Sequence, residues 1–76
     1  MRTLAEIAAE VRRVWLNVHF GAKPYLEAMA GLNGINDSYG QDSGREIVMY
    51  FLSNAKTWRG EDAKRIKAEL NKMLKR

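Results

Sequence analysis

Apolar residues recur at helical spacing from residue 4 onward, directly behind a helix-start signature. Thr3 stands three residues before Glu6, the spacing at which the two side chains cap each other's backbone N–H groups. We therefore expect a helix from about Leu4 to His19 that packs one face on a core, with Gly21 as its C-terminal cap. Trp15 is expected to anchor the core, because its neighbours on that face are all aliphatic. The predicted core face comprises Leu4, Ile7, Ala8, Val11, Val14, Trp15 and Val18.

The same signature recurs at Ser43 and Glu46, just before the apolar run Ile47–Leu52. Six apolar residues in a row fit either a buried strand or a buried helix. The helix start, and the residues that extend the segment beyond the length of a typical strand, favour a helix from about Gly44 to Ala55. A strand over the apolar run stays open as the alternative.

Two further helices complete the secondary-structure prediction. Pro24 suits the first turn of a short helix from Lys23 to Gly31 or Leu32. Glu61 and Asp62 mark the start of a last helix that runs to about Leu74, because negative charge is favoured at a helix N-terminus. Of these acids, Glu61 is expected to pair with Arg65 one turn later.

These elements predict an all-α fold, a small compact helical bundle of three main helices plus one short helix, with residues 1–76 as a single helical domain. The polar connection Asn33–Ser43 is expected to be ordered, with a positive backbone angle at the Asn33-Gly34 turn. Ile35 and Tyr39 are expected to hold this connection against the core.

Composition excludes several classes of site. The chain has 76 residues, one histidine (His19) and no cysteine, so it offers no disulfide, thiolate zinc site or thiol nucleophile. The serines, His19 and the acids have no spacing typical of a catalytic triad, and we expect no enzyme activity, no metal and no cofactor. Without an apolar run of membrane-spanning length, a cytoplasmic protein with no membrane partner is expected.

The excess positive charge lies in the last quarter of the chain. Residues 59–76 carry seven bases against three acids, whereas residues 1–58 carry six of each. A helix surrounded by lysines can contact nucleic-acid phosphates or an acidic protein surface, although such a face also serves solubility alone. The candidate contacts are Arg59, Lys64, Arg65, Lys67, Lys72 and Lys75.

Surplus apolar side chains on the third predicted helix suggest a protein interface. Met49 and Tyr50 point away from the core side of that helix on a helical wheel, and Tyr39 lies in the preceding connection. These three residues are the candidate protein interface, through which an unidentified protein partner or a second copy of the chain would bind. Core filling is the alternative for Met49 and Tyr50, and the pattern favours it, because a middle helix in a small bundle can be covered on several sides.

Segments spread over nearly the whole chain resemble small uncharacterised helical proteins encoded by phages and integrated elements of Gram-positive bacteria. The resemblance lies in Trp15, 20–22, 24–29, 39–48 and 51–60. It implies a non-catalytic module that docks onto a larger host or viral protein or nucleoprotein assembly, and it assigns no functional residue. Direct non-specific nucleic-acid binding through the basic C-terminal helix is the alternative.

Overall fold

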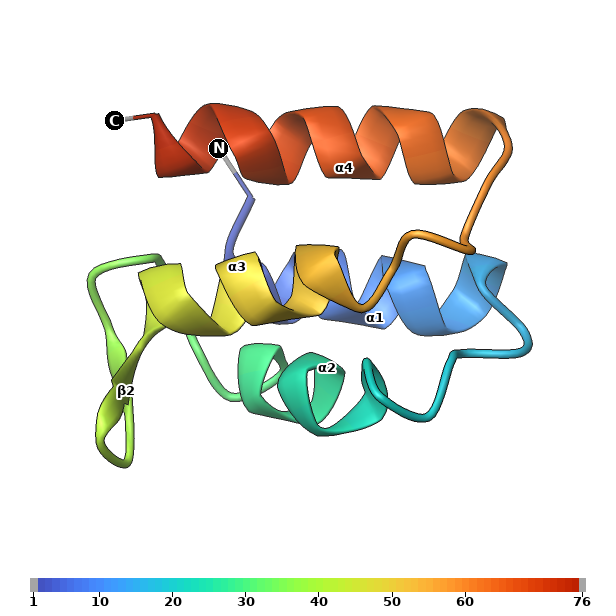
Figure 1. Ribbon diagram of the computed structural model, residues 1–76. Helices are drawn as coiled ribbons and strands as arrows, with labels where there is room; N and C mark the ends of the chain where they lie inside the picture. The colour runs from blue at the N-terminus through green and yellow to red at the C-terminus, as the bar shows by residue number, and fades with distance from the viewer. Residues whose placement is uncertain (1, 76) are drawn as a thin grey trace.

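Helices make up most of residues 2–75, the part of the chain that the structure, a computed structural model, describes (Figure 1). The elements are α1 (Leu4–Val14), α2 (Lys23–Met29), β1 (Ser38–Tyr39), β2 (Asp42–Ser43), α3 (Gly44–Ser53) and α4 (Glu61–Leu74). The prediction of a mostly helical chain with one short helix is confirmed. The prediction of a purely helical fold is wrong, because β1 and β2 form a small antiparallel hairpin.

The backbone N–H groups in the first turn of α1 find hydrogen-bond acceptors in the helix's own cap and in a distant segment. Thr3 and Glu6 form the predicted capping box, in which the Glu6 N–H donates to Thr3 Oγ1 and the Thr3 N–H donates to Glu6 Oε1. The next free donors, the N–H groups of Leu4 and Ala5, donate to the carbonyls of Asn33 and Leu32, both at 2.9 Å. The polar connection behind α2 therefore completes the N-terminus of α1.

The end of α1 differs from the prediction. The helix stops at Val14 and not at His19, since Trp15 leaves the helical conformation with φ −107° and ψ 88°. Its indole stacks on that of Trp58, with ring centroids 4.9 Å apart, and both rings meet Phe51 edge-on. Packing of this aromatic cluster outweighs the local helical pattern of residues 15–19. Gly21 consequently caps no helix, and His19 is exposed in a loop.

The apolar run Ile47–Leu52 is helical, as predicted, and α3 begins at the second capping box. Ser43 accepts from the Glu46 N–H, and the N–H groups of Gly44 and Arg45 donate to the carbonyls of Asp37 and Ile35. The same connection thus caps both α1 and α3. It also passes so close to α3 that a Cβ on Gly44 would lie 2.5 Å from the Gly34 carbonyl oxygen.

The hairpin occupies the middle of this connection. Ser38 pairs with Ser43 and Tyr39 with Asp42, which leaves Gly40 and Gln41 as a two-residue loop. Gly40 has φ +64°, whereas Gly34, where we expected the positive angle, does not. A positive φ at the first loop residue only is the geometry of a type II′ turn, which joins antiparallel strands with little strain.

The predicted core face of the first helix is confirmed in part: its members Leu4, Ile7, Ala8, Val11 and Trp15 are buried, whereas Val14 and Val18 pack half-buried against the core. All four helices contribute apolar side chains, and no polar or charged residue of the described chain is buried. In Figure 1, α4 and α2 lie on opposite sides of the layer that contains α3 and α1. Ile35 packs against the core as expected, but Tyr39 does not. The fully buried large side chains are Phe51, Leu4, Ile7, Met29, Ile66, Leu70, Val11 and Val48.

Candidate binding surfaces

Two large apolar side chains project from the middle of α3 although its core face is complete. Met49 is 51% exposed and Tyr50 is 44% exposed, while Ile47, Val48 and Phe51 on the opposite side are at most 2% exposed. The Tyr50 ring contacts that of the half-buried Tyr25 of α2, with centroids 5.3 Å apart. We call Tyr25, Met49 and Tyr50 the tyrosine face. Core filling, the alternative for Met49 and Tyr50, does not apply.

Tyr39, the third predicted interface residue, lies elsewhere. It is 52% exposed on the hairpin, which projects from the helices (Figure 1). No ring contact among the described residues joins Tyr39 to the tyrosine face. The structure therefore brings two of the three candidates together and adds Tyr25 of α2.

The six candidate basic residues divide into two groups. Arg65 and Lys67 bind other groups of the protein. Within residues 2–75, no carboxylate lies within ion-pair distance of the other four, Arg59, Lys64, Lys72 and Lys75. Lys67 Nζ donates to the Trp58 carbonyl at 2.6 Å and lies 5.9 Å from the centre of its ring. Burial, and to a smaller extent the charge of Arg59, lowers the pKa of Lys67.

Arg65 is tied to α1 instead of to Glu61. Its Nη2 lies 2.6 Å from Glu10 Oε2 and 3.1 Å from Asp62 Oδ1, so the predicted Glu61 pair is wrong. Glu10 also accepts from Arg2 Nη1 at 2.6 Å, and Arg2 in turn pairs with Glu69. The hydrogen bonds from Arg65 and then Arg2 lower the pKa of Glu10 to about 2. This network links α1 to α4 and removes Arg65 from the free basic surface.

The α4 face that remains free carries Lys64, Lys72 and Lys75, all exposed, with Arg59 just ahead of the helix. At 1.5 Å per residue, Lys64 and Lys75 are about 16 Å apart along the axis. These four side chains form what we call the free basic face. It can contact several phosphates or carboxylates at once.

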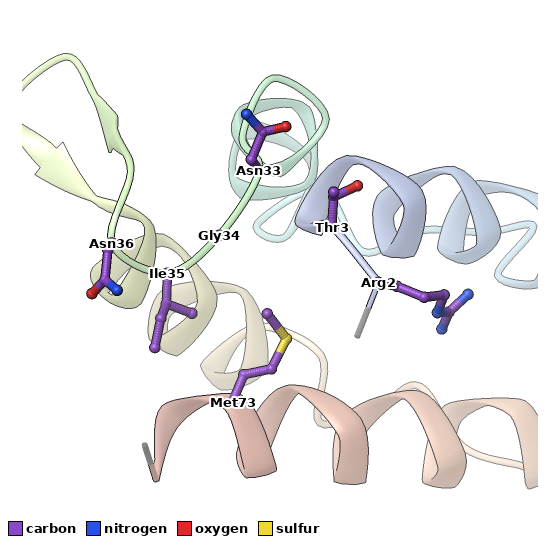
Figure 2. Close-up of a pocket in the computed structure, with 7 residues that line it drawn as sticks. All are labelled: Arg2, Thr3, Asn33, Gly34, Ile35, Asn36 and Met73. Atoms are coloured by element: carbon purple, nitrogen blue, oxygen red, sulfur yellow. The ribbon is translucent and has the colours of Figure 1, made fainter.

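A hollow of about 360 Å³ lies between the start of α1, the connection after α2 and the end of α4 (Figure 2). Ile35 and Met73 supply its apolar lining, and Asn33 and Asn36 supply amides. Figure 2 shows the Arg2 side chain pointing away from Ile35 and Asn36. Its guanidinium is hydrogen-bonded to Glu10 and Glu69. Without a titratable group directed into it, the hollow is a packing gap at the capping connection and offers no acid–base chemistry.

His19 and Ser53 line a second, smaller hollow of about 110 Å³, together with Asn54, Lys56 and Thr57. No hydrogen bond between His19 and Ser53 is formed, and no carboxylate lines the hollow. The geometry of a nucleophile activated by a base is therefore not assembled there. Nor do the described residues contain a cluster of three or more histidine, aspartate or glutamate side chains able to hold a metal ion.

Two exposed residues were missed by the sequence reasoning, Leu16 and Phe20. They were placed inside or just beyond a helix that in fact ends at Val14. The segment around Leu16 and Phe20 contains no acidic residue, which could have suggested a protruding hydrophobic pair. Only the loop geometry of the structure shows that the two side chains are exposed.

Among residues 2–75, no helix has both the length and the apolar character needed to cross a membrane. Comparison of the chain with models of protein families, with curated proteins and with solved structures yields no match.

Proposed function

We propose that this protein is a non-catalytic helical binding module of the phage or mobile-element type, which docks through the tyrosine face onto a larger host or viral protein or nucleoprotein assembly. The observation that carries the proposal is the exposure of Met49 and Tyr50 above a core that is already complete. Exposed large apolar side chains that the core does not need, and that are grouped with a further aromatic side chain, are typical of docking surfaces.

The composition of the tyrosine face suits a protein partner. Tyrosine and methionine are enriched at protein interfaces, because tyrosine combines apolar area with a hydroxyl and methionine adapts its shape. The outward side of α3 also carries Glu46 and Ser53, one turn before Met49 and one turn after it. They provide a polar rim around the apolar centre, the usual arrangement of an interface.

The test is site-specific photo-crosslinking in a Gram-positive host, with a benzophenone amino acid at position 50 or at position 68. Ala68 is exposed on α4 and serves as the matched control. We expect a discrete crosslinked partner from position 50 that is absent from position 68, and that is lost when Met49→Glu is added. Crosslinks of equal yield from both positions, or none from position 50, would contradict the proposal.

A second copy of the chain is one outcome that this test must separate. Sedimentation velocity at several concentrations distinguishes it, because a homodimer held by the tyrosine face dissociates on dilution. Tyr50→Glu should then give a monomer at every concentration, whereas Ala68→Glu, which adds the same charge, should leave the dimer unchanged.

The free basic face supports a second candidate function, direct non-specific nucleic-acid binding. The observation in its favour is that Arg59, Lys64, Lys72 and Lys75 have no carboxylate partner within residues 2–75. If these four cations neutralise four phosphates of duplex DNA, log affinity should fall against log salt with a slope of about −3.6. Fluorescence anisotropy with a labelled duplex measures that slope, and a flat titration would exclude this mode.

A further inference from the structure

Two connections meet at one end of the molecule. Residues 15–22 join α1 to α2, residues 54–60 join α3 to α4, and both lie at the same end of the helices (Figure 1). The Trp15–Trp58 stack joins them, and a hollow between them is lined by Leu16 and Asn17 from one and Thr57 and Arg59 from the other. We call these two connections together the loop end.

The loop end carries the two most exposed large hydrophobic side chains of the described residues. Leu16 is 84% exposed and Phe20 is 80% exposed, well above the values for the tyrosine face. The Phe20 ring makes one aromatic contact, an edge contact with the His19 ring, and the two ring centroids are 4.9 Å apart. Trp15, next to Leu16, is already buried in the core, so neither exposed side chain is needed to complete it.

Most charged side chains of the loop end and of the helix turns next to it are positive. Segments 11–26 and 47–60 contain five arginines and lysines and no aspartate or glutamate. The five are Arg12, Arg13, Lys23, Lys56 and Arg59, all exposed. The acids next to these segments are Glu10, which pairs with Arg13 as well as with Arg2 and Arg65, Glu27, Glu46, and the two acids at the start of α4, Glu61 and Asp62. The loop end therefore combines protruding apolar side chains with an excess of positive charge.

We infer that the loop end binds an anionic phospholipid surface, with Leu16 and Phe20 entering the interfacial layer and the surrounding cations contacting lipid phosphates. Apolar side chains flanked by lysine and arginine are the combination that holds proteins to anionic bilayers. The expectation of no membrane partner considered only spanning segments, which a surface-bound protein does not need.

Size and charge favour a lipid surface over the other occupants. The whole molecule extends only 29 × 23 × 19 Å between Cα atoms, so its loop end is a small face for a standard protein interface of ~800 Å² per partner. A bilayer needs no shape-matched partner area. A second copy facing this end would place five cations against five, and a nucleic-acid backbone would leave the aliphatic Leu16 without a contact.

Vesicle flotation tests this inference with the whole chain. The probes are vesicles of phosphatidylcholine alone and vesicles that contain about one third phosphatidylglycerol. We expect the wild type to float with the anionic vesicles and not with the neutral ones. Leu16→Ser with Phe20→Ser should weaken that binding about tenfold or more, because both side chains lose their apolar contact with the bilayer. Lys56→Glu with Arg59→Glu should weaken it as well.

The matched control is Met49→Ser with Tyr50→Ser, which removes the exposed apolar pair of the tyrosine face and should leave vesicle binding unchanged. All variants alter exposed residues, and circular dichroism verifies that each is folded. Absence of wild-type binding to anionic vesicles at low salt would overturn the inference. So would full binding of the Leu16→Ser, Phe20→Ser variant, since attraction of basic side chains alone would then explain the result. The control also separates this inference from the proposed docking function, which depends on Met49 and Tyr50.

Discussion

Replacing Gly44 by alanine sets two physical effects against each other. Gly44 is the first residue of α3, and alanine has the higher helix propensity by about 1 kcal/mol in a helix interior. On propensity alone, Gly44→Ala should stabilise the protein. The structure predicts the opposite, because the new Cβ would lie 2.5 Å from the Gly34 carbonyl oxygen and 2.9 Å from Ile35 Cα. Both are backbone atoms, so relief requires the connection and the helix to move apart.

The expected loss of stability follows from the two backbone hydrogen bonds that this movement breaks. The Gly44 N–H donates to the Asp37 carbonyl at 2.6 Å, and the Arg45 N–H donates to the Ile35 carbonyl at 2.9 Å. Each such bond contributes about 1 kcal/mol, and a buried donor left without a partner costs about 1–3 kcal/mol. After subtracting the gain in propensity, we expect a net loss of about 1–3 kcal/mol. In a domain of this size that corresponds to a Tm lower by about 5–20 °C.

The assay is thermal and urea unfolding followed by far-UV circular dichroism. Gly34→Ala is the matched control, since it lies in the same connection, has a negative φ, and would place its Cβ more than 4 Å from any neighbouring atom. It should change stability by less than about 1 kcal/mol, with a small gain expected. If Gly44→Ala raised the Tm as much as the control or more, the close approach of connection and helix would be refuted.

Three further outcomes are expected. Phe51→Ala should cost about 3–5 kcal/mol in urea unfolding and remove the near-UV signal of the tryptophans, because Phe51 is fully buried and contacts both stacked indoles edge-on. Glu10→Gln should lower the Tm at neutral pH. The difference should shrink as the pH falls from about 4.5 to about 2, since the depressed pKa of Glu10 stabilises the fold only while this carboxyl is ionised in the native state; a pH-independent difference would contradict the ion pairs. Tyr50→Glu should change stability by less than about 0.5 kcal/mol, because the side chain is exposed, and a larger loss would show that it belongs to the core.

Local sequence determined the helix starts and the core faces. The capping boxes at Thr3 and Ser43 need only residues three apart, and the apolar side of each helix follows from a period of 3.6 residues. The helical wheel of α3 also places Met49 and Tyr50 off the core side, but it left core filling open for both, and only the structure shows that they are exposed. The helix starts and the core faces depend on neighbours within one or two turns, so a single chain is enough to predict them.

Tertiary structure decided the features that join residues far apart in the chain. Trp15 ends α1 because Trp58, 43 positions later, stacks on it, and that early end exposes Leu16 and Phe20. Arg65 binds Glu10 and not Glu61 because α1 and α4 lie side by side. The hairpin forms where the connection must cap two helices, with strands too short to give an alternating pattern. For Trp15 and Arg65 the deciding contact partner lies outside the local window, and the free energy of that contact exceeds the small propensity differences that a sequence pattern reports.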